Sequence, residues 1–330
     1  MPAREFAMIV KESSYGVPMA SPTLGTDSFV LRLSGANAFT MQQTPVKGNI
    51  PYGGGYTTPA CRYSGQVSHT GALQGELYAG AFAKFLCDWA FTQINTGRTT
   101  PWTTTDASYV MPPTDLASVS IYHAYQLNDG TYRRRRHRGV KVVSGSITAT
   151  AQDQAAKFNF NLQGQGDDKN AAGSVADPDA TEFPAPADTD YPCGPYLFTH
   201  TAGNFKIASV RTQYNSLAIN FTNAMAPNWF EGKYASLVKF CGRDVKANVN
   251  LYLKASPDDE ASYKALTSLD TELTFDNGVS WLKFDFGANN AWDALPRDLP
   301  INNVYSWNGV LQNYWDGTSA TDFAVTAGTT

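Results

Sequence analysis

The feature that most constrains the fold of this chain is an order of elements that occurs twice. In each half, an alternating strand is followed by a loop rich in Gly and Pro, a second strand and one amphipathic helix. The first copy runs from Phe29 to Trp89 and the second from about Phe205 to Leu269. Recurrence of one supersecondary unit predicts two similar β-rich domains in a single chain.

Hydrophobic periodicity identifies the elements of these units. Alternation of large apolar and polar side chains predicts strands at Ser118–Gln126, Gly139–Thr150 and Lys157–Gln163. Asn128-Asp129-Gly130 predicts a hairpin turn between the first two. Residues 76–95 place apolar side chains at helical spacing instead, and Phe82, Phe85 and Trp89 are expected to form the buried face of that helix.

The second half repeats these signals. Val249 and Leu253 belong to an alternating strand, and Ser256-Pro257-Asp258-Asp259 has the residue types that begin a helix. Cys61–Trp89 and Cys241–Leu269 align without a gap, although their identity is near chance. The order of the elements, rather than identity, therefore carries the prediction of an internal duplication. Apolar positions also predict a strand near Val304–Leu311.

Local composition predicts where the domains begin and end. Residues 1–28 are expected to form an N-terminal arm with little core, followed by a first β domain at 29–165. Residues 166–195 form an acidic Gly/Pro linker, since the stretch 164–195 holds seven acids and one lysine. A second β domain is expected at 196–330.

Two long loops interrupt the predicted strands. Residues 40–60 contain three Pro and four Gly, and residues 222–236 contain Pro227 and Gly232, so a loop is expected in each place. Structureless loops of about 20 residues are uncommon inside a compact domain unless they bind something. Both segments are therefore candidate contact sites.

Charge and cysteine content exclude several classes of protein. The chain has 330 residues and a net charge of −4, which argues against a protein that wraps nucleic acid electrostatically. The four cysteines form no CxxC pair and are interpreted as small buried hydrophobes. The N-terminus lacks the order of a signal peptide, and no apolar run reaches the length of a membrane span.

The sequence carries no recognised catalytic or metal-binding motif, and no catalytic residue, metal ligand or cofactor is predicted. Gly53-Gly54-Gly55 lacks the strand-to-helix context of a phosphate loop, and the four histidines have no ligand spacing. A repeated β unit without a catalytic motif favours a building block over an enzyme.

The sharpest charge feature is an arginine run, which leaves three interpretations open. Arg133, Arg134, Arg135, Arg136 and Arg138 surround His137 just after the predicted hairpin turn. The run could contact nucleic acid, form a solvated hairpin arm, or pair with acidic side chains of a neighbouring subunit. The late aromatic residues Trp292, Trp307, Tyr314 and Trp315 could cap the core or lie at a subunit contact.

These patterns together resemble the tail tube proteins of long-tailed bacteriophages. The resemblance is carried by KESSYG near the start, by VSHTGALQGELYAGAFAKFLCDWAF, by YRRRRHRGVKVVSGSITATAQDQAAKFNFNLQGQG and by SLAINFTNAM in the second half. It implies a mainly β fold, a tail-tube-type β-sandwich or barrel with one short flanking helix, here duplicated within the chain.

The resemblance also implies partners and contact sites. Subunits would close into rings that stack into a hollow tube, with three chains in a pseudo-sixfold ring favoured over six, and DNA would pass without specific binding. Tape measure, tail terminator and baseplate proteins would be further partners in a virion tail assembled in the host cytoplasm, with no membrane. Inter-ring contacts are expected in the two loops, and the candidate residues are Pro45, Lys47, Ile50, Pro51, Tyr52, Tyr56, Pro227 and Trp229.

Two alternatives remain at this point. A tail terminator or baseplate-hub protein of the same fold would form one closed ring. A host-glycan-binding β-sandwich is the other alternative, and it is suggested by the aromatic residues and the Asn/Thr-rich loops.

Overall fold

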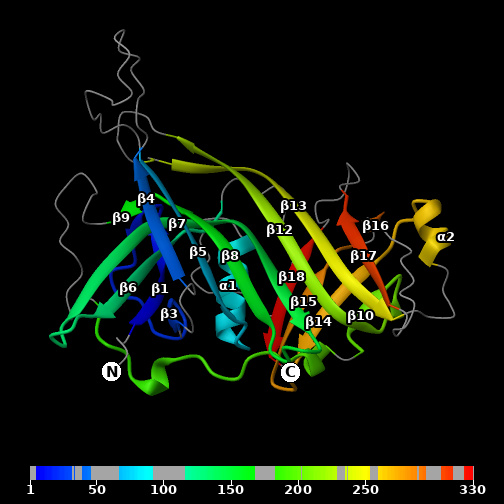
Figure 1. The fold of residues 1–330 in the computed structure, drawn as a ribbon, viewed down its shortest axis with the longest axis horizontal. Coiled ribbons are helices and arrows are strands. Elements are labelled where there is room, and N and C mark those ends of the chain that lie inside the picture. The colour runs from blue at the N-terminus through cyan, green and yellow to red at the C-terminus, as the bar shows by residue number, and fades with distance from the viewer. Residues whose placement is uncertain are drawn as a thin grey trace, which may run out of the picture.

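The computed structural model describes residues 5–31, 33, 39–45, 67–91, 116–167, 183–201, 203–228, 235, 237–252, 259–287, 290–294, 306–314 and 323–329. Within this part of the chain the protein is mainly β, and neighbouring strands are antiparallel throughout both sheets. The predicted mainly β fold is therefore confirmed. Figure 1 shows the widest sheet as a row of long strands, with α1 and β18 drawn behind it.

The first half contains nine strands and one helix among the described residues: β1 Glu5–Ser14, β2 Val17–Pro18, β3 Ser28–Leu31, β4 Phe39–Pro45, β5 Val67–Glu76, α1 Ala81–Phe91, β6 Val119–Gln126, β7 Tyr132–Thr150, β8 Lys157–Gly164 and β9 Gly166–Asp167. The predicted turn at Asn128-Asp129-Gly130 is confirmed, because it joins β6 to β7 and Gly130 has a φ of +86°. Glycine takes that left-handed conformation at little cost.

The second half adds these elements: η1 Asp188–Asp190, η2 Phe198–Thr201, β10 Phe205–Ile207, β11 Val210–Arg211, β12 Tyr214–Asn228, β13 Leu237–Tyr252, α2 Asp259–Lys264, β14 Thr271–Asp276, β15 Ser280–Asp285, β16 Asn290–Ala294, β17 Ser306–Asn313 and β18 Ala324–Thr329. The strand predicted near Val304–Leu311 corresponds to β17.

The first half forms two layers that share one strand. The C-terminal part of β7 continues the series β4-β5-β8-β7, whereas its N-terminal part lies in the series β3-β1-β6-β7-β9. A β-bulge between Val142 and Ser144 marks where β7 passes from one layer to the other. Bulges bend a strand and increase its twist, which accounts for the change of direction here.

The second half forms two layers from the corresponding strands. Its first layer is β12-β13-β17-β16, and its second is the separate five-stranded sheet β11-β10-β14-β15-β18. β15 lies in the second layer and β16 in the first, so these two strands have the positions that the two parts of β7 have in the first half. β16 also carries a register shift, between Trp292 and Ala294.

One continuous sheet joins the two halves. β7 pairs with β12 from Ser144↔Thr222 to Thr150↔Ser216, so eight strands follow in the order β4-β5-β8-β7-β12-β13-β17-β16. Gly145 allows the close approach at this junction, since a Cβ atom there would lie 2.5 Å from Phe160 and 2.9 Å from Phe221. The rings of Phe160 and Phe221 pack edge to face across it, with centroids 5.7 Å apart.

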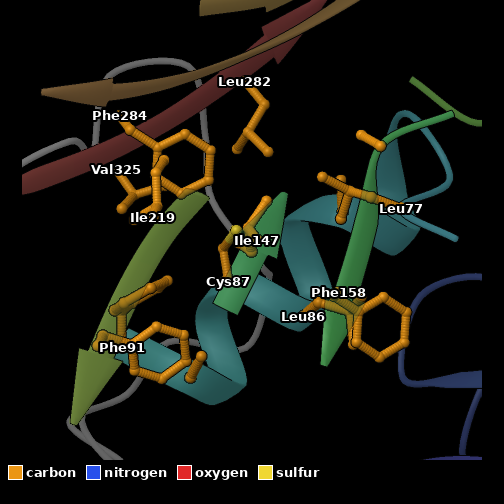
Figure 2. Packing of buried hydrophobic residues seen from close by; sticks show 14 of the residues in the cluster. Leu77, Leu86, Cys87, Phe91, Ile147, Phe158, Ile219, Leu282, Phe284 and Val325 are labelled. Carbon is orange, nitrogen blue, oxygen red and sulfur yellow. The ribbon is translucent and has the colours of Figure 1, made fainter. Parts of the chain in front are cut away.

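The helix α1 is the centre of the hydrophobic core. The prediction that Phe82, Phe85 and Trp89 are buried is confirmed, and the Trp89 indole donates a hydrogen bond of 2.9 Å to the Val140 carbonyl. Figure 2 shows Cys87 of α1 facing Ile147 of the wide sheet. The same view places Leu282, Phe284 and Val325 of the second layer over this core. The helix therefore lies between two sheets rather than on the outside of one.

Three sequence-based expectations were wrong in part. Residues 5–14 of the predicted N-terminal arm form β1, and Ala7 and Ile9 are fully buried, because β1 pairs with both β3 and β6. Residues 40–45 of the predicted first loop belong to β4, and residues 222–228 of the predicted second loop belong to β12. Cys87 is buried, and burial raises the pKa of its thiol, but Cys193 and Cys241 are exposed.

Candidate functional site: a polar sheet face and two sheet edges

The wide sheet has one face against the core and one face that is polar. Along β8, Phe158, Phe160 and Leu162 are buried, whereas Asn159 and Asn161 between them are exposed. Alternation along a strand places these two sets on opposite faces. The side of the sheet opposite to α1 is therefore lined by the polar set.

Hydroxyl and amide side chains continue this face across the other strands. All of them are exposed or half-buried and alternate with buried apolar residues. They include Thr40 and Gln42 on β4, Thr70 and Gln74 on β5, Ser146 and Thr148 on β7, Ser216 and Asn220 on β12, Asn248 and Asn250 on β13, and Asn308 and Gln312 on β17. A groove of about 490 Å³ crosses this face between β4, β5, β8 and β7.

The charged groups on the polar face are few and mostly neutralised. Lys246 Nζ lies 3.5 Å from Asp293 Oδ2, and Lys157 Nζ lies 2.9 Å from Asp153 Oδ1. The Gln312 amide donates a hydrogen bond of 2.5 Å to Asp244 Oδ1. The described side chains of this face include no basic cluster, so they offer no strong attraction to a phosphate backbone.

The two ends of the eight-strand series each pair with one strand among the described residues. β4 pairs with β5, and β16 pairs with β17 and is met at its first residue by Leu269, whose amide donates a hydrogen bond of 2.6 Å to the Asn290 carbonyl. Soluble proteins usually protect such edges with lysines, covering loops or very short strands. β4 carries no lysine, and its exposed side chains are Thr and Gln.

Side chains of the second half also bind the end of α1. Asn223 is fully buried and donates hydrogen bonds of 3.0 Å to the Ala90 carbonyl and 2.9 Å to the Val142 carbonyl. Arg243 donates one of 3.1 Å to the Phe91 carbonyl, and its guanidinium lies over the Phe91 ring. The last carbonyls of a helix have no partner within it, so these contacts cap α1.

The arginine run lies in β7 and finds partners within the chain. Arg134 Nε donates a hydrogen bond of 2.8 Å to the Phe183 carbonyl. Arg136 is buried and donates one of 3.2 Å to the Tyr122 hydroxyl. Both stand on the face of β7 that Phe183 covers, and Arg133 and Arg135 alternate to the other face. Arg138 follows at the start of the bend and is half-buried.

Most of the predicted loop residues fall outside the part of the chain that the structure describes. Those residues are Lys47, Ile50, Pro51, Tyr52, Tyr56 and Trp229. Pro45 is the last residue of β4 and lies opposite Val67. Pro227 lies near the end of β12 opposite Val238. Of the late aromatic residues, Trp292 is buried and Tyr314 is exposed.

The fold brings together two histidines that the sequence keeps 68 residues apart. His69 Nε2 and His137 Nδ1 are 3.1 Å apart in a buried hydrogen bond between β5 and β7. Burial lowers the pKa of His69 to about 4, although Asp167 opposes that shift, and burial also lowers the pKa of His137. Spacing along the chain gave no signal for this pair, because only strand pairing makes the two residues neighbours.

Among the described residues, no group of three or more His, Cys, Asp or Glu is arranged to hold a metal ion. None of the helices in those same residues is both long and apolar enough to cross a bilayer.

The described residues thus form an antiparallel two-layer β protein with a polar, largely neutral sheet face. Comparison with protein families is more specific, because the model of the phage tail tube protein family matches residues 3–306. The chain therefore belongs to the phage tail tube family, a structural family of the virion tail, and the resemblance seen in the sequence is confirmed. No curated protein matches the chain.

Proposed function

We propose that this tail tube protein closes into rings of three chains, and that the rings stack into a hollow tube through which the phage genome is delivered. The single observation that carries the proposal is the way strand pairing repeats along the chain. Membership of the family accounts for self-assembly into a tail together with other tail proteins. The number of chains, the lining of the channel and the contacts between rings are proposed here.

The pairing pattern supports a duplication, since each pairing within the first half, other than that of β1 with β2, has a counterpart in the second. β1 with β3 corresponds to β10 with β11, β1 with β6 to β10 with β14, and β6 with β7 to β14 with β15. β4 with β5 corresponds to β12 with β13, and β5 with β8 to β13 with β17. β7 with β8 corresponds to β16 with β17, and β7 with β9 to β15 with β18.

Barrel geometry favours three chains over two or six. Each chain contributes eight strands to the wide sheet, so three chains contribute 24. With strands about 4.8 Å apart and tilted by about 40°, 24 strands give a barrel roughly 48 Å wide between backbones. Side chains then leave a bore of roughly 30 Å, which admits a DNA double helix. Two chains would give a barrel roughly 32 Å wide between backbones, which is too narrow for DNA. Six chains would give a barrel roughly 96 Å wide, which is much wider than DNA needs.

The polar face is proposed to line this bore. Its opposite face is buried against α1 and the second layer, so only the polar face is available to a channel. Neutral hydroxyl and amide groups bind water and give phosphate neither a cluster of cations nor an apolar patch. DNA would move along such a surface without being held.

The remaining contacts of the tube are proposed from the loops and the arginine run. The segment 41–59 is proposed to contact the adjacent ring; residues 41–45 of it belong to β4, and the rest lies outside the described part of the chain. Tape measure, tail terminator and baseplate proteins would bind the ends or the interior of the tube, and assembly would take place in the host cytoplasm. Arg133 and Arg135 remain candidates for pairing with acidic side chains of a neighbouring subunit.

Electron microscopy of the purified protein tests the proposal. Hollow tubes whose end views have pseudo-sixfold symmetry and contain three chains by mass per ring are expected. Single closed rings that never stack would favour the terminator or hub alternative. Monomers at high concentration, together with binding on a glycan array, would favour the glycan-binding alternative. A variant lacking residues 48–56 should form rings but no tubes, and normal tubes would contradict the role of the loop.

A further inference from the structure

The helix α1 of the first half covers the second layer of the second half. Leu282 and Phe284 of β15 are fully buried, and they belong to the same hydrophobic cluster as Cys87 and Phe91 of α1. Figure 2 shows these two side chains of β15 pointing toward the core that α1 fills. On this inner face of the second layer, the one turned toward the wide sheet, a helix of one half therefore covers the next half.

The same two positions in the first half are occupied by arginines. Counted from the hairpin turn, Arg133 of β7 takes the place of Leu282, and Arg135 takes the place of Phe284. Both arginines point inward, because His137 two residues further on packs against the first residue of β4, with ring centroids 5.7 Å apart. Leu282 and Phe284 are fully buried, whereas Arg133 and Arg135 are only half-buried. The inner face of the first half is therefore less completely covered at this end.

Arg135 also lacks an acceptor among the described residues. Its Nε atom is buried and has no hydrogen-bond partner there. Glu5, the carboxylate at this end of β1, already pairs with His123, whose Nε2 lies 2.6 Å from the Glu5 Oε1. Arg134 and Arg136, on the opposite face of β7, both donate to acceptors within the chain. A buried guanidinium donor without an acceptor is costly, so the position calls for a partner such as a carboxylate.

The helix α2 is the counterpart of α1 and lies at the far end of the wide sheet. Each helix follows the second strand of its four-strand layer, β5 or β13, and contacts the strand with the register shift, β7 or β16. Figure 1 shows α1 behind the middle of the sheet and α2 at its end. The sequence of α2 begins with Asp259 and Glu260, and Leu266 just after it is exposed. Within the chain, no further half follows that α2 could cover.

We infer that α2 of one copy packs against the inner face of the second layer of the next copy, and that its acidic first turn binds Arg133 and Arg135 there. The inference rests on the proposed ring, in which the first half of one copy follows the second half of its neighbour. It gives α2 the position toward the next copy that α1 has toward the second half. Of the three interpretations of the arginine run, it selects pairing with a neighbouring subunit and names the partner segment.

The difference between the two contacts has a physical reason. The contact of α1 with Leu282 and Phe284 forms within one chain, so it can be apolar and never needs to face water. The contact of α2 forms only when copies meet, and an apolar surface in its place would be exposed on every free subunit. Arginine and carboxylate side chains are well hydrated before they meet, and they then form charge-assisted hydrogen bonds with a defined geometry.

Exchange of the two sets of charges tests this contact in the full chain. Arg133→Glu with Arg135→Glu should raise the protein concentration needed for tube formation about tenfold or more, because like charges then oppose each other. Asp259→Arg with Glu260→Arg should do the same. The variant with all four substitutions restores opposite charges, and it should assemble close to the concentration that the parent protein needs. Circular dichroism of each variant checks that the subunit is folded.

The acidic pair Asp188 and Asp190 in η1 supplies a matched control. Asp188→Arg with Asp190→Arg changes the net charge by the same amount as the α2 variant, and it should leave assembly unchanged. If the parent protein forms rings but both two-residue reversals assemble normally, this inference is wrong and the proposed ring stands. The same conclusion follows if both folded reversals are impaired and the four-residue exchange does not restore assembly. If the parent protein forms no rings, the proposed function fails and the inference fails with it.

Discussion

The two halves of the chain have similar strand pairings but differ in how the layers are joined. In the first half, β7 runs unbroken over Tyr132–Thr150 and belongs to both layers. In the second half, the same path is divided between β15 and β16, and the second layer is a separate sheet. The second half therefore has a similar strand order, but among the described residues it has no strand that belongs to both layers, as β7 does in the first half.

The helices differ more than the strands. α1 has eight buried residues out of eleven, whereas α2 has six residues and is followed by Leu266, which is 73 % exposed. Figure 1 places α1 behind the middle of the wide sheet and α2 at its far end. The ring of Phe91 at the end of α1 contacts Phe221 and Phe323 of the second half, with centroids 4.7 and 5.4 Å away. One helix thus supplies core to both halves, and this allows the second helix to be short.

The largest effect is expected where the halves meet. Gly145→Val would place its side chain against Phe160, the Asn159 carbonyl and Phe221, all within 3 Å of the new Cβ atom. Overpacking of this kind costs about 3 kcal/mol, because rings and backbone must shift. Urea unfolding followed by circular dichroism should show the loss as a lower midpoint.

Gly242→Ala is the matched control for that substitution. Gly242 is also in a strand, β13, but a Cβ atom there has open space around it. Its free energy of unfolding should stay within about 0.5 kcal/mol of that of the parent protein. Equal destabilisation by the two variants would show that the junction is no more tightly packed than the rest of the sheet, and the comparison of the halves would lose its physical basis.

The strands and the first helix could be predicted from the sequence because each leaves a local signal. Phe158, Phe160 and Leu162 alternate with polar residues, and Phe82, Phe85 and Trp89 recur at helical spacing. The pairing of β7 with β12 leaves no such signal, because residues more than 60 positions apart meet there. The loop expected from residue 222 was wrong for the same reason, since the β13 partner extends β12 through Pro227 to Asn228.

A second difference between the halves is expected in their sensitivity to acid. Three of the four histidines, His69, His123 and His137, lie in strands of the first half, and His200 lies in η2. The folded-state pKa of His69 is lowered to about 4, so its neutral form stabilises the fold above the unfolded pKa of about 6.5. That stability is lost as the pH falls from about 6.5 towards 4, by about 2 kcal/mol at pH 5.

Urea midpoints between pH 7.5 and 4.5 measure this effect. His69→Gln should be less stable at pH 7.5, since the hydrogen bond to His137 changes, but its stability should fall less steeply with acid. The groups facing the pair include Asp167, His123 and Arg135, and these stay in place in the variant. His200→Gln is the control in the second half and should keep the steep fall. If the urea midpoints of all three proteins fall equally steeply with pH, the His69–His137 pair is not the cause of the acid sensitivity.

The polar face illustrates why only part of the candidate site could be inferred in advance. Thr, Asn and Gln are common in the predicted strands, but the sequence does not say that those of different strands share one face. Register and the bulge in β7 decide this, because one residue of slip exchanges the two faces of a strand. The arginine run was visible at once, whereas its partners Phe183 and Tyr122 depend on the folding of distant segments.

The smallest effect is expected at the end of α2, the shorter of the two α-helices. Leu266 adopts a φ of +51°, where its amide donates to the Tyr263 carbonyl and the Thr267 amide donates to the Ser262 carbonyl. This Schellman arrangement favours glycine, because a left-handed residue with a Cβ atom is strained. Leu266→Gly should therefore raise stability by about 0.5 kcal/mol despite the greater freedom of glycine in the unfolded chain.

Thermal unfolding monitored by circular dichroism checks this increase, and Leu269→Gly is its control. Leu269 is 5 % exposed and belongs to the hydrophobic core, so the same change there should destabilise the protein by about 3 kcal/mol. A loss of stability in Leu266→Gly would mean that its exposed side chain contributes contacts that outweigh the strain. The second helix would then be part of the core of its half, and the contrast with α1 would be one of size alone.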